Sequence, residues 1–284
     1  MTRALLRKVK RAVKTIFRRN TEPSDPVRQE LERLRSAPRH MPLTTDLFGF
    51  RFDLVDGASF VACYESIVRK GSYRFSSPVD APYVIDCGAN VGVSVVYFKQ
   101  MYPRSRILAF EADPAVFATL EANVQRAEFA NVELVNKAVW TELGEIPFWH
   151  EGADAGRIAQ AADNCGNDLS PVPTVRLRDY LREPVDLLKL DIEGAEVDVL
   201  LDCGDALRNV RTLFVEYHSF ASQAQRLDLL MTTLASAGFR LFVQTEQCAP
   251  QPFVRRTAHL GMDLQLNIFG VRTEDEAETV TRDR

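Results

Sequence analysis

Cysteine is scarce and scattered in this 284-residue chain, with five residues, an odd number, and no Cys-x-x-Cys pair. This pattern favours neither a disulfide framework nor a zinc site. We therefore expect reduced thiols and a cytoplasmic protein.

Long apolar runs are also missing, and no stretch has the pattern of a membrane span or of a signal peptide. In the N-terminal segment, Leu5, Val9 and Ile16 repeat at helical spacing, and residues 1–19 carry eight basic and no acidic residues. We interpret residues 1–20 as a basic amphipathic helix suited to an anionic membrane surface, which makes the protein a candidate for peripheral attachment to the inner membrane. The alternative is a helix that packs on the domain or on a partner, with its cations solvated.

Positive charge is in deficit after that segment. The whole chain has a formal net charge of −4 although its first residues are basic, so the remainder is acidic, and it ends in an acidic tail at 273–284. A negatively charged protein surface repels the phosphates of nucleic acids, and we therefore expect no nucleic-acid partner.

Repeated strand and helix patterns occupy the rest of the chain. Residues 21–43 indicate a linker and a short helix (27–36), and residues 44–80 an N-terminal elaboration of the catalytic domain, with a strand-like pattern at 48–54 and a helical one at 60–70. The domain proper is expected at 81–272. Its expected elements are strands at 83–86, 107–111, 132–135, 186–191 and 213–218, helices from 93, at 114–127 and at 227–237, a hairpin-like piece at 140–150, an irregular loop or lid at 151–173, and a final strand pair at 239–244 and 264–271.

Such alternation of strands and helices predicts an α/β protein with a doubly wound, mostly parallel sheet. The final strand pair predicts an antiparallel edge strand, and the segment before residue 81 adds an N-terminal helical extension.

The sequence Val-Ile-Asp-Cys-Gly-Ala-Asn-Val-Gly at 84–92 joins the first of these strands to a helix. Strand, glycine turn and helix form the loop on which α/β proteins bind nucleotides, and we expect Gly88 and Gly92 to allow close approach of a ligand. Asp86 would repel a pyrophosphate and attract a cationic or ammonium-bearing cofactor. Asn90 stands where the dinucleotide fingerprint has its middle glycine, which weakens a dinucleotide interpretation.

Two further residues extend this candidate cofactor site. Glu111 ends the second strand, where a carboxylate accepts hydrogen bonds from both hydroxyls of a ribose. Asn136 ends the third strand and is a candidate contact for an adenine amine, although a role in the turn is an equal alternative. NAD-binding proteins share the combination of glycine turn and strand-end acid.

Four motifs together resemble the FkbM family of S-adenosylmethionine-dependent methyltransferases. They are Val-Ile-Asp-Cys-Gly-Ala-Asn-Val-Gly at 84–92, Ala-Phe-Glu-Ala-Asp-Pro at 109–114, Leu-Lys-Leu-Asp-Ile-Glu-Gly-Ala-Glu at 188–196 and Phe-Val-Glu-Tyr-His at 214–218. The resemblance implies a class I methyltransferase fold, S-adenosylmethionine as cofactor, and methyl transfer to hydroxyl oxygens of sugars, polyketides or lipids.

The candidate catalytic residues lie at the carboxyl ends of the fourth and fifth strands, where open α/β sheets bind ligands. We expect His218 to be the base that takes the hydroxyl proton, with Asp191 or Glu216 orienting it or acting instead. Glu196 is expected to cap a helix, on one face of which it would lie with Glu193. The spacing of Asp191, Glu193 and Glu216 does not require a divalent metal, and we expect none.

The preferred function is therefore an S-adenosylmethionine-dependent O-methyltransferase acting on a sugar, glycolipid or secondary metabolite. Membrane binding by residues 1–20 would favour a lipid-linked acceptor. An NAD-dependent oxidoreductase and a non-catalytic, membrane-tethered cofactor-binding protein are the alternatives. Acceptor selectivity is expected in residues 40–80 and 151–173.

Overall fold

A computed structural model describes residues 25–153, 155–159 and 169–272. The predicted basic helix at 1–20 and the acidic tail at 273–284 lie outside the described residues. The elements in chain order are α2 (Pro26–Arg35), β1 (Leu43–Thr45), β2 (Phe52–Leu54), α3 (Gly57–Cys63), a π-helix (Tyr64–Arg69), β3 (Tyr83–Cys87), α4 (Val93–Met101), β4 (Arg106–Phe110), α5 (Pro114–Arg126), β5 (Val132–Val135), β6 (Ala138–Trp140), β7 (Gly144–Trp149), β8 (Arg157–Ile158), β9 (Leu169–Arg176), a 3-10 turn (Leu177–Tyr180), β10 (Val185–Leu190), α6 (Glu196–Cys203), a second 3-10 turn (Gly204–Asn209), β11 (Val210–Phe220), α7 (Leu227–Ser236), β12 (Phe239–Cys248) and β13 (Met262–Arg272).

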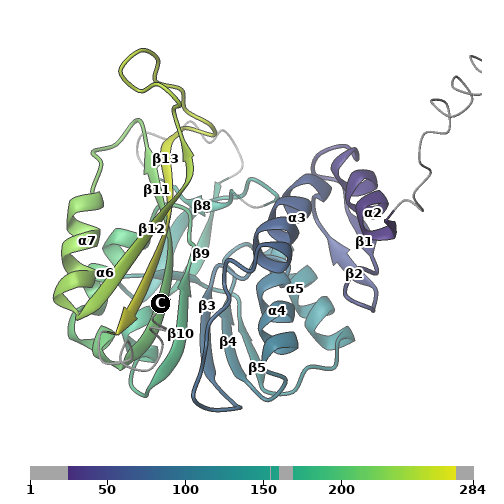
Figure 1. Ribbon diagram of the computed structural model, residues 1–284, viewed down its shortest axis with the longest axis horizontal. Coiled ribbons are helices and arrows are strands. Elements are labelled where there is room, and N and C mark those ends of the chain that lie inside the picture. The colour runs from purple at the N-terminus through teal and green to yellow at the C-terminus, as the bar shows by residue number, and fades with distance from the viewer. Residues whose placement is uncertain (1–24, 154, 160–168, 273–284) are drawn as a thin grey trace, which may run out of the picture.

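A seven-stranded sheet forms the centre of the fold, in the order β12-β13-β11-β10-β3-β4-β5. Strands β5, β4, β3, β10 and β11 pair in parallel, and β13 pairs antiparallel with β11 and β12. Figure 1 shows α6 and α7 on one side of this sheet and α4 and α5 on the other. The predicted doubly wound, mostly parallel α/β fold with an antiparallel edge is confirmed.

The central strands are buried because apolar residues face helices on both sides of them. In β3 the last four residues are all buried, and β4 and β10 each have a similar buried run. Continuous burial of this kind is typical of parallel strands covered on both faces. One core cluster contains the inner faces of α6 and α7, and a second contains those of α4, α5 and the N-terminal segment.

Helix α5 begins as its sequence predicts. Pro114 occupies the first turn, and the Asp113 side chain accepts hydrogen bonds from the backbone amides of Ala115 and Val116. A carboxylate at this position satisfies amides that have no partner within the helix and is favoured by the helix dipole. The first turn of α5 is thereby fixed at the carboxyl end of β4.

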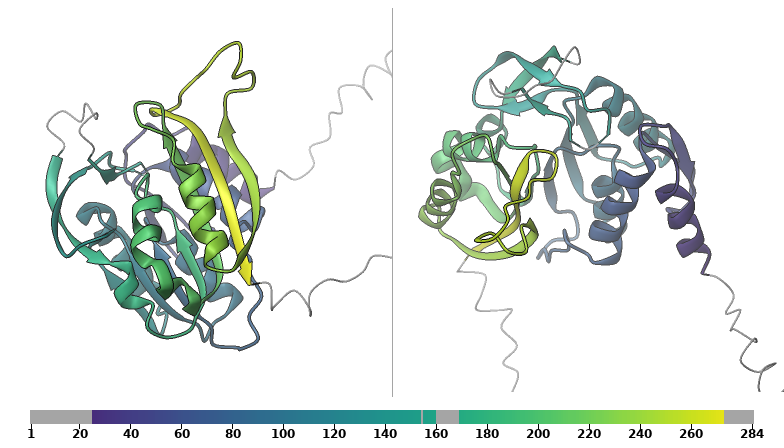
Figure 2. Two further views of the ribbon diagram at one scale, coloured as in Figure 1. Left: turned by 90° about the vertical axis from the view of Figure 1, so that its left-hand side faces the viewer. Right: turned by 90° about the horizontal axis from the view of Figure 1, so that it is seen from above.

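A second sheet with the strand order β6-β9-β7-β8 corrects two predictions. The piece at 140–150 is not a hairpin, because β9 lies between β6 and β7 and pairs with both. The segment 151–173, expected to be an irregular loop or a lid, contributes β8 and the first half of β9, whereas residues 154 and 160–168 lie outside the described residues. Figure 2 shows this teal sheet apart from the purple N-terminal segment.

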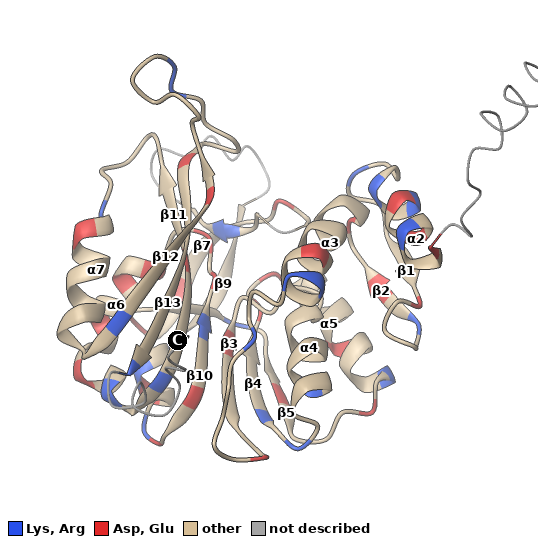
Figure 3. Cartoon of the chain, viewed as in Figure 1, with Lys and Arg blue, Asp and Glu red and all other residues tan. Residues whose placement is uncertain are grey.

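The N-terminal elaboration packs on the same core as α4 and α5. The pattern at 48–54 yields only the short strand β2, which pairs with β1, because Phe48 and Phe50 enter an aromatic cluster with Phe52 and Phe60 instead of extending the strand. The helical pattern at 60–70 is divided between α3 and the π-helix. Helix α2 contributes Leu31 and Leu34 to this core and also carries both acidic and basic residues, as Figure 3 shows.

Within the described residues, no helix combines the length and the apolar character needed to cross a bilayer. Cys87, Cys203 and Cys248 are free thiols.

Candidate active site

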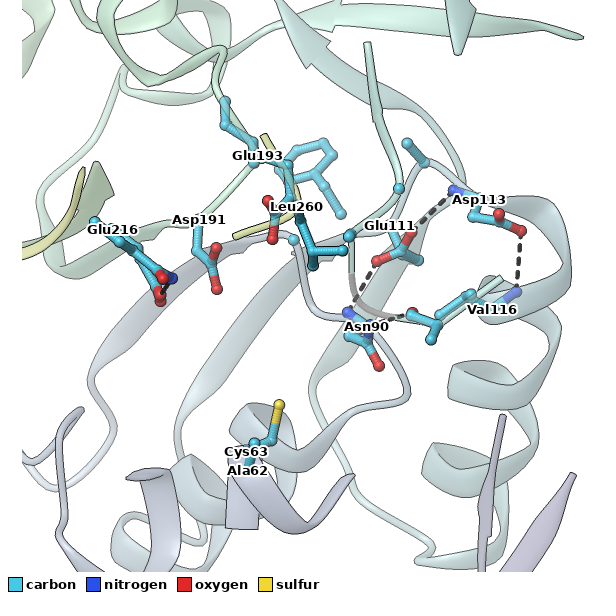
Figure 4. A pocket seen from close by; sticks show the side chains of 18 of the residues that line it. Ala62, Cys63, Asn90, Glu111, Asp113, Val116, Asp191, Glu193, Glu216 and Leu260 are labelled. Carbon is cyan, nitrogen blue, oxygen red and sulfur yellow. Dashed lines mark hydrogen bonds between the residues drawn. The ribbon is translucent and has the colours of Figure 1, made fainter. Parts of the chain in front are cut away.

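A cavity of about 370 Å³ lies at the carboxyl ends of the parallel strands. Its size falls in the range of small-molecule sites. Figure 4 shows two groups of polar side chains around it: Asn90, Glu111 and Asp113 on one side, and Asp191, Glu193 and Glu216 on the other. We call these the cofactor end and the acidic end.

The glycine turn between β3 and α4 forms part of the cofactor end, with Gly88 and Asn90 lining the cavity. Both residues have a left-handed backbone, with φ of +85° at Gly88 and +49° at Asn90. A Cβ atom on Gly88 would lie 1.9 Å from the carbonyl oxygen of Asp191, and one on Gly92 would lie 2.8 Å from Leu120. These two positions therefore require glycine because a side chain would clash with neighbouring protein atoms. The expectation from the sequence was instead that the glycines allow close approach of a ligand.

Glu111 is the best-defined polar group of the cofactor end. Its Oε2 accepts a hydrogen bond from the Asn90 amide at 2.9 Å, and its Oε1 accepts one from the Asp113 amide at 2.9 Å. Glu111 is 9% exposed. Burial raises the pKa of Glu111 to about 7, and the two backbone amides oppose that rise.

Asp86, expected to attract an ammonium-bearing cofactor, does not line the cavity. It is fully buried, Ser94 Oγ donates to its Oδ2 at 2.5 Å, and Lys189 Nζ lies 3.2 Å from its Oδ1. Lys189 is the neighbour of Asp86 across β10 and β3, so the two side chains share one face of the sheet. Burial alone would lower the pKa of Lys189, but the carboxylates of Asp86 and Asp191 outweigh it and raise that pKa.

Asn136 serves the turn instead of the cavity. Its Nδ2 donates to the carbonyl oxygens of Glu111 at 2.9 Å and of Ala112 at 3.2 Å. Since Asn136 does not line the cavity, the structural alternative from the sequence describes it better than the adenine contact.

Three carboxylates line the acidic end: Asp191 after β10, Glu193 two residues later, and Glu216 on β11. Lys189 Nζ lies 3.4 Å from Asp191, and the side-chain amide of Gln265 donates to Glu216. Burial raises the pKa of Glu193 to about 8 and that of Glu216 to about 7. The charge of Asp191 adds to both rises, and that of His218 opposes them.

The turn that carries Glu193 is held by Glu196. Helix α6 begins only at Glu196, so the two glutamates do not share a helical face, and Glu193 has a left-handed φ of +55°. Glu196 Oε1 accepts hydrogen bonds from the amides of Ile192 at 3.3 Å and Gly194 at 2.9 Å. Glu196 was expected to cap a helix, and its side chain closes the turn that immediately precedes α6.

His218 lies behind this turn and does not itself line the cavity. Its side chain is 1% exposed, with Nδ1 3.0 Å from Glu196 Oε1 and Nε2 3.6 Å from Glu193 Oε2. Burial would lower the pKa of His218, but Glu193 and Glu196 outweigh it and raise that pKa well above its ordinary value. The structure therefore brings His218 to the acidic end but not into direct contact with the cavity, where the sequence placed a base.

The sequence locates one wall of the cavity only broadly and does not identify another. One comes from α3 and the residues after it, with Ala62, Cys63 and Tyr73. The other comes from the connection between β12 and β13, with His259 and Leu260. The position of β13 beside β11 brings this connection to the acidic end, and a sequence pattern carries no signal of that proximity.

The fold and the cavity define an α/β protein of the doubly wound class with a ligand site at the carboxyl ends of its parallel strands. The chain belongs to the FkbM methyltransferase family, because a model of the methyltransferase FkbM domain matches residues 86–241.

Two methyltransferases and one solved structure are similar to this chain. Methyltransferase 1 of Beauveria bassiana is 28% identical over 198 residues, which cover 60% of this chain and 77% of that protein. Methyltransferase sdnD of Sordaria araneosa is 26% identical over 230 residues, covering 69% and 88%. The crystal structure of a methyltransferase FkbM from Methylobacillus flagellatus is similar with a TM-score of 0.47 and 16% identity, covering 84% of this chain and 58% of that one.

Proposed function

We propose that this methyltransferase is an S-adenosylmethionine-dependent O-methyltransferase, with a hydroxyl of a sugar, glycolipid or secondary metabolite as acceptor. The observation that carries the proposal is Glu111. This carboxylate faces a cavity of cofactor size while two backbone amides hold its oxygens in place.

The residues of the cofactor end fit a nucleoside cofactor. A carboxylate fixed by two backbone amides keeps further lone pairs that accept hydrogen bonds from ribose hydroxyls. Gly88 and Asn90 supply the adjoining wall. When bound, S-adenosylmethionine supplies a methyl group on a sulfonium centre, and the acidic end of the cavity stabilises positive charge.

The acidic end would hold the acceptor hydroxyl and take up its proton. Of the carboxylates that line it, Asp191 already has Lys189 as a partner, whereas Glu216 has the uncharged amide of Gln265. Glu193 faces His218, and a carboxylate without such a close cationic partner is the freer proton acceptor, so Glu216 is the base in this proposal. His218, predicted as the base, acts here by fixing Glu193 and the turn.

A hydroxyl acceptor also agrees with one named relative. The 2-O-methyltransferase NoeI of Sinorhizobium fredii is 27% identical over 155 residues, which cover 48% of this chain and 63% of that protein. Oxygen is therefore the atom to test first among acceptors.

If the predicted basic helix at 1–20 binds a membrane, the proposed acceptor is lipid-linked. The test is deletion of residues 1–20, followed by co-sedimentation with anionic vesicles and an assay of methyl transfer. Loss of vesicle binding is expected, and unchanged binding and activity would exclude a membrane role for the segment.

Calorimetric titration with S-adenosylhomocysteine and with NAD tests the cofactor. We expect one S-adenosylhomocysteine per chain and no heat from NAD. Binding of NAD instead would support the oxidoreductase alternative. A protein that binds S-adenosylhomocysteine, and keeps its biological role after Asp191→Ala and His218→Ala, would be a non-catalytic binding protein.

A further inference from the structure

Asp191, Glu193 and His218 form a cluster with the spacing of metal ligands. Each offers one ligand atom, and these atoms all lie within 4.8 Å of one another. We infer that this cluster binds a divalent cation at the acidic end of the cavity, with Asp191, Glu193 and His218 as its protein ligands.

The distance between Glu193 and His218 fits two ligands of one cation better than a direct hydrogen bond. Their facing atoms, Oε2 and Nε2, are 3.6 Å apart. Hydrogen bonds of this type are about 2.7–3.2 Å long. Two ligands of one cation, each about 2.1 Å from it, lie roughly 3–3.5 Å apart in octahedral or tetrahedral geometry.

His218 is oriented as metal-bound histidines are. Its Nδ1 lies 3.0 Å from Glu196 Oε1, and the same oxygen accepts the backbone amide of Gly194 in the turn beside Glu193. A ring N–H donated to a carboxylate leaves the other nitrogen as the lone-pair donor and fixes the plane of the ring. Here that nitrogen is Nε2, which lies 3.6 Å from Glu193 Oε2 and 3.4 Å from the side-chain nitrogen of Gln265, on a side chain that is 1% exposed.

The cluster is rich in carboxyl groups. Lys189 is the cationic side chain among five of them when His218 is a neutral ligand; the five belong to Asp86, Asp191, Glu193, Glu196 and Glu216. Uncompensated buried charge is strongly unfavourable. A divalent cation would offset part of the negative charge that these carboxylates carry when ionised, and carboxylate oxygens with one imidazole nitrogen suit first-row transition ions such as Mn²⁺.

The role of the cation rests on the proposed function, although the site itself does not. An acceptor hydroxyl bound to the cation loses its proton more readily, and Glu216 stands on the same wall to receive it. The hydroxyl oxygen then forms a bond to the methyl carbon, the carbon–sulfur bond breaks, and its electron pair stays on sulfur. This inference replaces the expectation of no metal, which considered Glu216 in place of His218.

The test is a titration of Mn²⁺ into the full chain after removal of metal with a chelator, with free Mn²⁺ followed by electron paramagnetic resonance. We expect one Mn²⁺ per chain. Glu193→Gln and Asp191→Asn should each weaken binding at least tenfold, and Glu196→Gln, which replaces the carboxylate that orients His218 with an amide, about 10- to 100-fold. Circular dichroism melting checks that each variant is folded.

Glu246→Gln is the matched control, because Glu246 lines the same cavity but is bonded to Asn267 outside the cluster. It should bind Mn²⁺ as the wild type does. The inference is overturned if the wild type binds no Mn²⁺ in a stoichiometric manner, or if Glu193→Gln and Asp191→Asn bind it unchanged. Titration of the metal-free protein with S-adenosylhomocysteine tests the proposed function separately, so the two can fail independently.

Discussion

The two ends of the cavity are built in different ways. At the cofactor end, short chain segments after β3 and β4 place backbone amides on the single carboxylate of Glu111. At the acidic end, side chains from the turn after β10 and from β11 and β13 contact one another, and negative charge accumulates. Backbone geometry therefore defines the first end, and tertiary packing defines the second.

This difference explains why the two ends should respond differently to substitution. The cofactor end depends on a left-handed turn that only particular residues adopt, so its failure is a failure of the backbone. The acidic end depends on charges that neutral isosteres can replace without altering the fold.

The largest expected effect is that of Gly88→Ala at the cofactor end. The new Cβ would meet the Asp191 carbonyl at 1.9 Å in a backbone of φ +85°. We expect a loss of about 3 kcal/mol or more in the free energy of unfolding, from overpacking and the left-handed conformation together. Gly49 has the same φ with nothing within 4 Å, so Gly49→Ala should cost only about 1–2 kcal/mol. Urea denaturation measures both, and equal losses would contradict the packing argument.

A smaller effect is expected from pH, through Glu111. Because the pKa of Glu111 is about 7, S-adenosylhomocysteine should bind about tenfold more weakly at pH 6 than at pH 8, where the carboxylate is ionised. Calorimetry at the two pH values checks this. In Glu111→Gln the difference should vanish, and a tenfold difference that persists would assign the titration to another group.

The same group gives a stability effect of defined sign. The folded-state pKa of Glu111 lies above its ordinary value of 4.5, so its contribution to stability is full below about pH 4.5 and is lost as the pH rises through 7. The free energy of unfolding of Glu111→Gln should therefore fall less than that of the wild type between pH 5 and pH 8. Urea denaturation at both values measures it, and parallel curves would contradict the assignment.

The smallest effect is expected for Asn136→Ala. The substitution removes one donor to the carbonyls of Glu111 and Ala112, which costs about 1 kcal/mol of stability. S-adenosylhomocysteine affinity should stay within about threefold of the wild type, equivalent to well under 1.4 kcal/mol. A tenfold loss in calorimetry would restore Asn136 as a cofactor contact.

The sequence predicted the features that depend on local order. The parallel strands, the start of α5 at Pro114, the antiparallel edge and the place of Glu111 all follow from apolar runs, capping residues and strand ends. Asp191 and Glu216 were also located at the cavity, because strand ends meet at one edge of a parallel sheet.

The features that depend on long-range pairing could not be predicted in this way. The Asp86 carboxylate pairs with Lys189, which lies 103 residues later in the sequence, only because β3 and β10 are neighbours in the sheet. The insertion of β9 between β6 and β7 likewise depends on pairing and not on local pattern. His218 was expected at the end of a strand, but β11 continues to Phe220, and the burial of His218 behind Glu193 depends on where the turn before α6 lies.

The most direct test of the account is a calorimetric titration of S-adenosylhomocysteine into three proteins: the wild type, Glu111→Gln and Glu216→Gln. If the two ends act separately, Glu111→Gln should weaken binding tenfold or more, since hydrogen bonds to a charged group contribute about 1.5–3 kcal/mol. Glu216→Gln should bind nearly as the wild type does. The reverse pattern, or a wild type that does not bind S-adenosylhomocysteine, would contradict the assignment of the cofactor end.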